Sequence, residues 1–119
     1  LKTSKNNIYA LGDCAEVHQQ VLFYIEPLMR GVKALAQTLT GKTTGVQYNA
    51  MPVSIKTTLC PITVCPPKPS DKGSWQYQNN DSGISARFVD STGKLLGFAL
   101  TEQACNEKET LTKQMNNNL

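Results

Sequence analysis

The stretch IYALGDCAE, residues 8–16, places an acidic residue directly behind a short apolar run. The apolar residues 8–11 predict a buried strand, and Gly12 allows neighbouring atoms to approach the chain closely. Asp13 would then stand at the carboxyl end of that strand, which is where open α/β sheets bind their ligands. A carboxylate accepts hydrogen bonds from hydroxyl groups, so the pattern favours a polyol ligand at Asp13.

A helix is predicted downstream, over PLMRGVKALAQTLTGK at residues 27–42. Pro27 suits the first turn of a helix, and Gly41 is a typical stop. The apolar run 21–25 before it predicts a short strand. One stripe of the helix is apolar and is expected to face the core: Leu28, Met29, Val32, Leu35, Ala36 and Leu39.

The segments IYALGDCAEV at 8–17 and PLMRGVKALAQTL at 27–39 resemble the second FAD-contacting motif of flavoproteins built from two dinucleotide-binding domains. The resemblance implies that Asp13, next to Gly12, holds the ribityl chain of FAD. It also implies that the N-terminus of the helix faces the pyrimidine edge of the flavin, where its partial positive charge stabilises the anionic reduced ring. Tyr24 and Ile25, just before the helix, would offer backbone N–H groups to the flavin.

Two later segments, MPVSIKT at 51–57 and GFALTEQACNEK at 97–108, extend the resemblance along the chain. The order of these motifs is similar to that of the bacterial rubredoxin reductases that serve alkane hydroxylation. Those are FAD enzymes that take electrons from NADH and pass them singly to the iron of rubredoxin, their acidic partner. The resemblance implies that Lys56 approaches the flavin pyrimidine oxygen, where a cation favours the reduced ring.

The glycines of the chain form no G-x-G-x-x-G turn behind a strand, so neither FAD nor NADH has its phosphate-binding turn here. A protein with two dinucleotide folds also needs more than about twice this length. We therefore expect a C-terminal piece of a larger enzyme. NADH would bind in the missing part, and the piece alone would be inactive.

The second half of the chain predicts a small antiparallel sheet crossed by one helix. Strands are indicated over 53–59, 75–77, 84–88 and 94–100, with hairpin turns at 79–83 and 90–93. Thr101 is a suitable N-cap for a final helix that ends near residue 115. Its expected inner stripe is Ala104, Lys108, Leu111 and Met115. The predicted fold is thus α+β: residues 1–50 hold the last strand and helix of an FAD-binding α/β domain, and residues 51–119 form an antiparallel-sheet domain that helps to seat rubredoxin.

The four cysteines do not indicate a metal site, because Cys-x-x-Cys pairs are absent and His18 is the only histidine. Cys14 is expected to pack as a small buried residue. If Cys60 and Cys65 lay on a strand, their separation of five would turn them to opposite faces, so a functional disulfide between them is not expected. No paired carboxylates suggest catalytic acid–base chemistry, and we assign no catalytic side chain.

Composition narrows the class of protein further. The net charge is +3, with 12 basic and 9 acidic residues spread along the chain, which does not indicate nucleic-acid binding. No apolar run approaches the roughly 20 residues of a membrane helix, so a cytoplasmic protein is expected. Two alternatives remain open: another FAD/NAD-linked reductase that serves ferredoxin or a disulfide, and a free-standing protein-binding domain.

Overall fold

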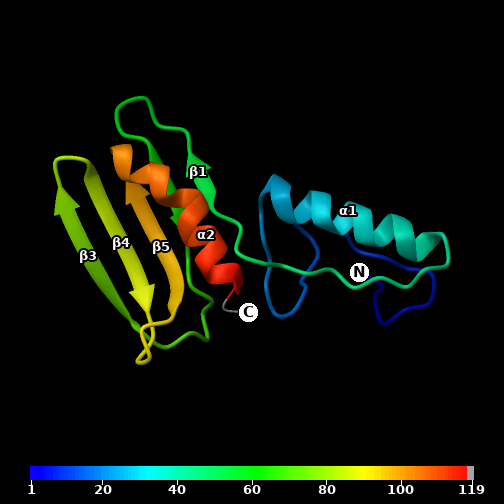
Figure 1. Ribbon diagram of the computed structural model, residues 1–119. Helices are drawn as coiled ribbons and strands as arrows, with labels where there is room; N and C mark the ends of the chain where they lie inside the picture. Colours follow the sequence, from blue (N-terminus) through cyan, green and yellow to red (C-terminus); the bar gives the residue numbers. More distant parts are fainter. Residues whose placement is uncertain (118–119) are drawn as a thin grey trace. The chain divides into compact units, whose positions relative to one another are not determined.

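The computed structural model describes residues 1–117 and divides into two units (Figure 1). The first unit is Leu1–Tyr48, and the second begins at Asn49. The first unit contains helix α1, Ile25–Leu39, with irregular segments along it. The second contains a five-stranded sheet, a 3₁₀ helix and an α-helix.

Two predicted strands of the first unit are wrong in this structure. Residues 8–11 form no strand, and Tyr9 makes only an isolated antiparallel bridge with Lys2. The run 21–25 is irregular as far as Tyr24, and Ile25 already begins the helix. A strand is stabilised by backbone hydrogen bonds to a neighbouring strand. The backbone of residues 8–11 is hydrogen-bonded to the short segment that precedes it, with Thr3 N–H donating to the carbonyl of Ile8 over 3.0 Å.

Helix α1 was predicted correctly as an element, but its buried face differs from the expected one. The buried residues are small: Pro27, Gly31 and Ala34. At Gly31 a Cβ atom would lie 2.7 Å from Leu11 Cδ1, so the missing side chain lets residues 8–11 pack against the helix. Several large apolar residues of the expected inner stripe are exposed instead: Leu28, Met29, Val32 and Leu39.

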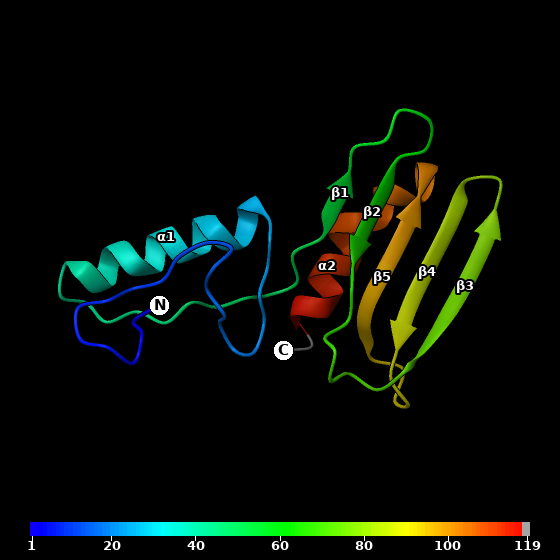
Figure 2. The same cartoon turned by 180° about the vertical axis from the view of Figure 1, so that it is seen from behind.

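The sheet of the second unit is antiparallel throughout, with the strand order β1-β2-β5-β4-β3 (Figure 2). Its strands are β1 Val53–Ile55, β2 Ile62–Cys65, β3 Ser74–Asn80, β4 Gly83–Val89 and β5 Leu95–Thr101. The last three strands and the turn at 90–93 lie where the sequence predicts them. The turn predicted at 79–83 is shorter in the structure, because β3 extends to Asn80 and β4 begins at Gly83. The expected strand over 53–59 begins at Val53 as predicted but is too long, because β1 ends at Ile55 and an exposed loop leads to β2.

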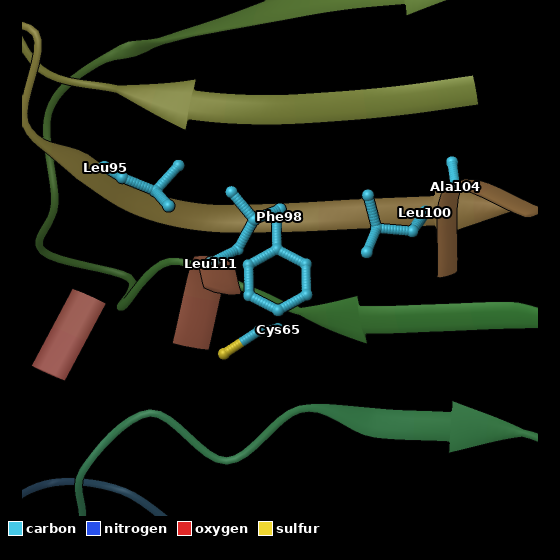
Figure 3. Close-up of a cluster of buried hydrophobic side chains, with 6 residues drawn as sticks. All are labelled: Cys65, Leu95, Phe98, Leu100, Ala104 and Leu111. Carbon is cyan, nitrogen blue, oxygen red and sulfur yellow. The ribbon is translucent and has the colours of Figure 1, made fainter. Parts of the chain in front are cut away.

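One face of the sheet is covered by the 3₁₀ helix η1, Glu102–Glu107, and by α2, Lys108–Asn117 (Figures 1 and 2). Thr101 precedes η1 without capping it. Its hydroxyl instead accepts a hydrogen bond from the N–H of Ile84, at 2.9 Å. Figure 3 shows the core that results, in which β5 side chains gather with residues of β2, η1 and α2. Its members are Cys65, Leu95, Phe98, Leu100, Ala104 and Leu111.

The turn between β4 and β5 is organised by one carboxylate. Asp90 Oδ1 accepts hydrogen bonds from the backbone N–H groups of Thr92 and Lys94 and from the Thr92 hydroxyl, at 2.8, 3.0 and 2.7 Å. The Thr92 hydroxyl, followed by these N–H groups, lowers the pKa of Asp90 below its ordinary value. Gly93, at φ +83°, completes the turn in a conformation that suits glycine.

Candidate functional site

Gly12 and Asp13 form a tight turn next to the first turn of α1. The N–H of Ala15 donates to the carbonyl of Gly12 at 2.9 Å, and Gly12 has φ +84°. Leu28 Cδ1 lies 3.6 Å from the place where a Cβ of Gly12 would stand. Asp13 is exposed. The structure therefore brings Gly12 beside the N-terminal part of α1 and leaves the carboxylate of Asp13 open to solvent.

The N-terminus of α1 presents backbone N–H groups and a carboxylate that is paired with an arginine. Tyr24 is the extended N-cap residue, and Ile25 begins the helix with 75% of its surface exposed. Glu26 places a carboxylate in the first turn, where Arg30 Nε donates to it over 2.9 Å. The guanidinium of Arg30 offsets the charge of Glu26, so the helix dipole still favours an anion at this end.

A small pocket lies between the Gly12 turn and α1, lined among others by Leu11, Gly12, Leu28 and Tyr48. It has room for no more than about one water molecule. Burial raises the pKa of the Tyr48 phenol. The pocket is too small for an organic cofactor ring.

Lys56 belongs to the second unit and is the first residue after β1. It is exposed and begins the loop to β2, so its predicted position inside a strand is wrong. The loop is closed locally by a hydrogen bond from the Thr57 hydroxyl to the carbonyl of Cys60. A short β1 followed by an exposed loop therefore leaves Lys56 open to solvent.

The cysteines are all free thiols. Cys14 is exposed and donates to the carbonyl of Leu11, so its predicted burial is wrong. Cys65 is 5% exposed in the core, and burial raises its pKa, partly offset by a hydrogen bond from the backbone of Met51. Within residues 1–117, no three His, Cys, Asp or Glu side chains are grouped to hold a metal ion.

Sequence reasoning missed an ion pair that fixes η1 to the sheet. Arg87 Nη2, from β4, donates to Glu107 Oε2 over 2.7 Å, and the Ser85 hydroxyl lies 3.4 Å from the same oxygen. Arg87 shares a register position with Phe98, on the sheet face that the helices cover. The alternation of residues 84–88 did not reveal this contact, because it sets the apolar side chains of Ile84 and Phe88 on the face opposite to Arg87.

In the described part of the chain, no helix has the length and apolar content that crossing a membrane requires. The sequence pattern of the family described as "Rubredoxin binding C-terminal domain" matches residues 45–115. The matched region covers more than half of the chain and contains the whole sheet of the second unit. The chain belongs to this family. Lys56 lies inside the matched region, whereas Gly12, Asp13, Tyr24 and Ile25 lie before it.

The comparison extends to the first unit through relatives that match nearly the whole chain. A rubredoxin-NAD(+) reductase of Alcanivorax borkumensis is 49% identical over 115 residues, and one of Acinetobacter baylyi is 43% identical over 114 residues. A nitric oxide reductase FlRd-NAD(+) reductase of Aliivibrio fischeri is 34% identical over 116 residues. These matches cover 97%, 95% and 98% of the chain but only 30%, 29% and 30% of the relatives. The chain thus spans about a third of the length of these proteins.

Proposed function

We propose that this chain is the C-terminal part of an FAD-dependent oxidoreductase that passes electrons from NADH to rubredoxin. The family match over residues 45–115 carries the proposal, because it falls on the unit that has its own sheet and core. The relatives at 49% and 43% identity are both named rubredoxin-NAD(+) reductases and match residues of both units. NADH would bind in a part of the enzyme that this chain does not contain.

The second unit would help to seat rubredoxin. Residues 51–119 carry seven basic and six acidic residues, so a general positive field does not account for docking. Local cations do so better: Lys56 is exposed in the loop after β1, and Lys68 and Lys72 are exposed in the loop before β3. Exposed lysines raise the rate of association with an acidic partner and make it dependent on salt.

FAD is the cofactor that the proposal requires, and residues of the first unit carry chemical groups that can bind it. Asp13 offers an exposed carboxylate to ribityl hydroxyls, directly after a glycine at positive φ. The N-terminus of α1, at Tyr24 and Ile25, offers backbone N–H groups and a dipole that favours negative charge. Lys56 would add a cation from the second unit. When bound, FAD would supply the conversion of one hydride into two single-electron transfers.

We further propose that the electrons serve alkane hydroxylation in the cytoplasm, as the motif resemblance implies. A second candidate is electron delivery to a nitric oxide reductase FlRd. The nitric oxide reductase FlRd-NAD(+) reductase described above is 34% identical over 98% of the chain. The higher identities, 49% and 43%, favour rubredoxin as the electron acceptor. Ferredoxin or disulfide substrates have no comparable support among these relatives.

The test is to express the chain together with the sequence encoded upstream of Leu1 and to assay the purified product. NADH-dependent reduction of rubredoxin, followed by the visible absorbance of its iron centre, is the expected result. Equal or faster reduction of a FlRd or a ferredoxin would contradict the preferred partner. In parallel, the 119-residue chain alone is titrated with rubredoxin by calorimetry. Binding that weakens with salt is expected, and equal binding of an acidic ferredoxin would contradict a rubredoxin-specific surface.

A further inference from the structure

Two cysteines that are 45 positions apart in the sequence meet at one carbonyl oxygen. Cys60 Sγ lies 3.7 Å from the carbonyl oxygen of Pro61, and Cys105 Sγ lies 3.6 Å from the same oxygen. The two sulfur atoms are therefore no farther apart than these two distances placed end to end. The pairing of β2 with β5 creates this meeting, since Ile62 lies opposite Thr101 and the N–H of Glu102 donates to Pro61 at 2.9 Å.

The environment of this pair differs from that of the other two thiols. Cys60 and Cys105 are both half-buried, so small molecules reach them while neighbouring groups hold them in place. Cys65 is buried in the core, and Cys14 is exposed in the first unit. Figures 1 and 2 both place the β1–β2 loop at the end of the sheet where η1 begins. Leu59, next to Cys60, is 96% exposed, so the loop can shift without disturbing the core.

We propose that Cys60 and Cys105 form a redox-responsive dithiol that closes to an intramolecular disulfide in the presence of a peroxide. Hydrogen peroxide oxidises one thiol to a sulfenic acid: its O–O bond breaks, one oxygen stays on the sulfur, and the other leaves as water. The second thiol then displaces a second water from that sulfur as the S–S bond forms. The pair loses two electrons and two protons in total, and a dithiol reductant restores it. This proposal rests on the sheet unit alone and is independent of FAD binding.

The disulfide would tie the β1–β2 loop to η1. Closure must bring the sulfurs to about 2.0 Å, which requires rotation of both side chains and a small movement of the loop. The loop begins at Lys56, so oxidation would restrict the segment that carries this lysine. It would also join parts of the sheet unit that lie far apart in the sequence, which constrains the unfolded chain and favours the folded one.

The experiment uses the 119-residue chain, reduced and then exposed to stoichiometric hydrogen peroxide, followed by digestion without reductant and mass spectrometry. The expected product is a Cys60–Cys105 crosslinked peptide pair with two hydrogens fewer than its reduced parts. Alkylation of both thiols should be lost together on oxidation and return with dithiothreitol. Cys14→Ser is the matched control and should leave the crosslink intact, because Cys14 belongs to the other unit. Cys60→Ser and Cys105→Ala should each abolish it.

Two results would overturn the proposal. One is independent oxidation of Cys60 and Cys105 to sulfinic acids without a crosslink. The other is a mixture of pairings that includes the core thiol Cys65, as a chain without fixed structure would give. Trp75 fluorescence of each variant before oxidation establishes that the sheet is folded, so a lost crosslink reports the missing thiol. A Cys60–Cys105 bond formed in the folded chain and absent from the urea-unfolded chain supports the proposal most directly.

Discussion

Replacing Leu111 by alanine should lower the free energy of unfolding of the second unit, because it weakens the packing of α2 on the sheet. Leu111 is 3% exposed and is the residue through which α2 enters the core beside Phe98 and Leu100. The change removes three carbon atoms from the core, worth about 2.4 kcal/mol at roughly 0.8 kcal/mol per buried methylene. The cavity left in a well-packed site raises the expected cost to about 3–4 kcal/mol. The total free energy of unfolding of a small domain is only about 5 kcal/mol or a little more.

Trp75 makes this measurement specific to the second unit. It is the only tryptophan, and its ring centroid lies 5.3 Å from that of Phe88 in an edge-on arrangement. Urea unfolding followed by its fluorescence should show a midpoint lower by about 3 M, given a slope of about 1 kcal/mol per M for a unit of this size. Gln114→Ala, at an exposed position of the same helix, is the control and should change stability by less than about 0.5 kcal/mol. Equal midpoints for the two variants would refute the packing of α2 described above.

Three further predictions concern charged residues. In the protein expressed with its upstream sequence, Asp13→Ala should weaken FAD binding about tenfold or more, because a hydrogen bond to a charged group contributes roughly 1.5–3 kcal/mol. Fluorescence titration measures this, with Glu16→Ala as the control, and unchanged retention would contradict the role of Asp13. Lys56→Met should lower the flavin reduction potential by about 30 mV, equivalent to about 1.4 kcal/mol for two electrons. A redox titration with an unaltered potential would retire Lys56 as a flavin neighbour. Asp90→Asn should lower the melting temperature at neutral pH. Because the pKa of Asp90 is lowered in the folded chain, its carboxylate contributes fully to stability above the ordinary carboxyl pKa of about 3.9. That contribution to stability is lost as the pH falls through the pKa of the folded state. The difference in melting temperature between the two proteins should therefore vanish in acid. A constant difference down to the lowest pH would show that the charge of Asp90 is not responsible.

The parts of the fold that could be predicted are those that local sequence determines. The turn residues 90–93, the alternation along β4 and the apolar run of β5 indicated two strands in the right places without knowledge of their neighbours. Helix α1 was likewise indicated by its periodicity and by Gly41. The short strand β2 was missed because prolines flank its four residues, and proline is a signal of loops.

The errors concern features that depend on distant partners. Residues 8–11 are apolar enough for a strand, but the structure gives them only the bridge between Lys2 and Tyr9. The apolar stripe of α1 was expected to face the core, but it is largely exposed, and small residues such as Gly31 and Ala34 face the packed side. The meeting of Cys60 with Cys105 follows from strand pairing across 45 positions, which residue spacing alone does not reveal.

The position of β5 in the sheet has a consequence for how the chain is made. It is the central strand, yet it is synthesised after all the others, which lie on either side of it as two antiparallel pairs. During translation the β3–β4 hairpin can form on its own, because seven residue pairs hold it in register. The β1–β2 hairpin has only three residue pairs, and the edge of β2 has no hydrogen-bonding partner strand until residues 95–101 emerge. Interruption of synthesis before residue 95 would therefore leave two unjoined hairpins with unpaired edges, the form most prone to associate with other chains.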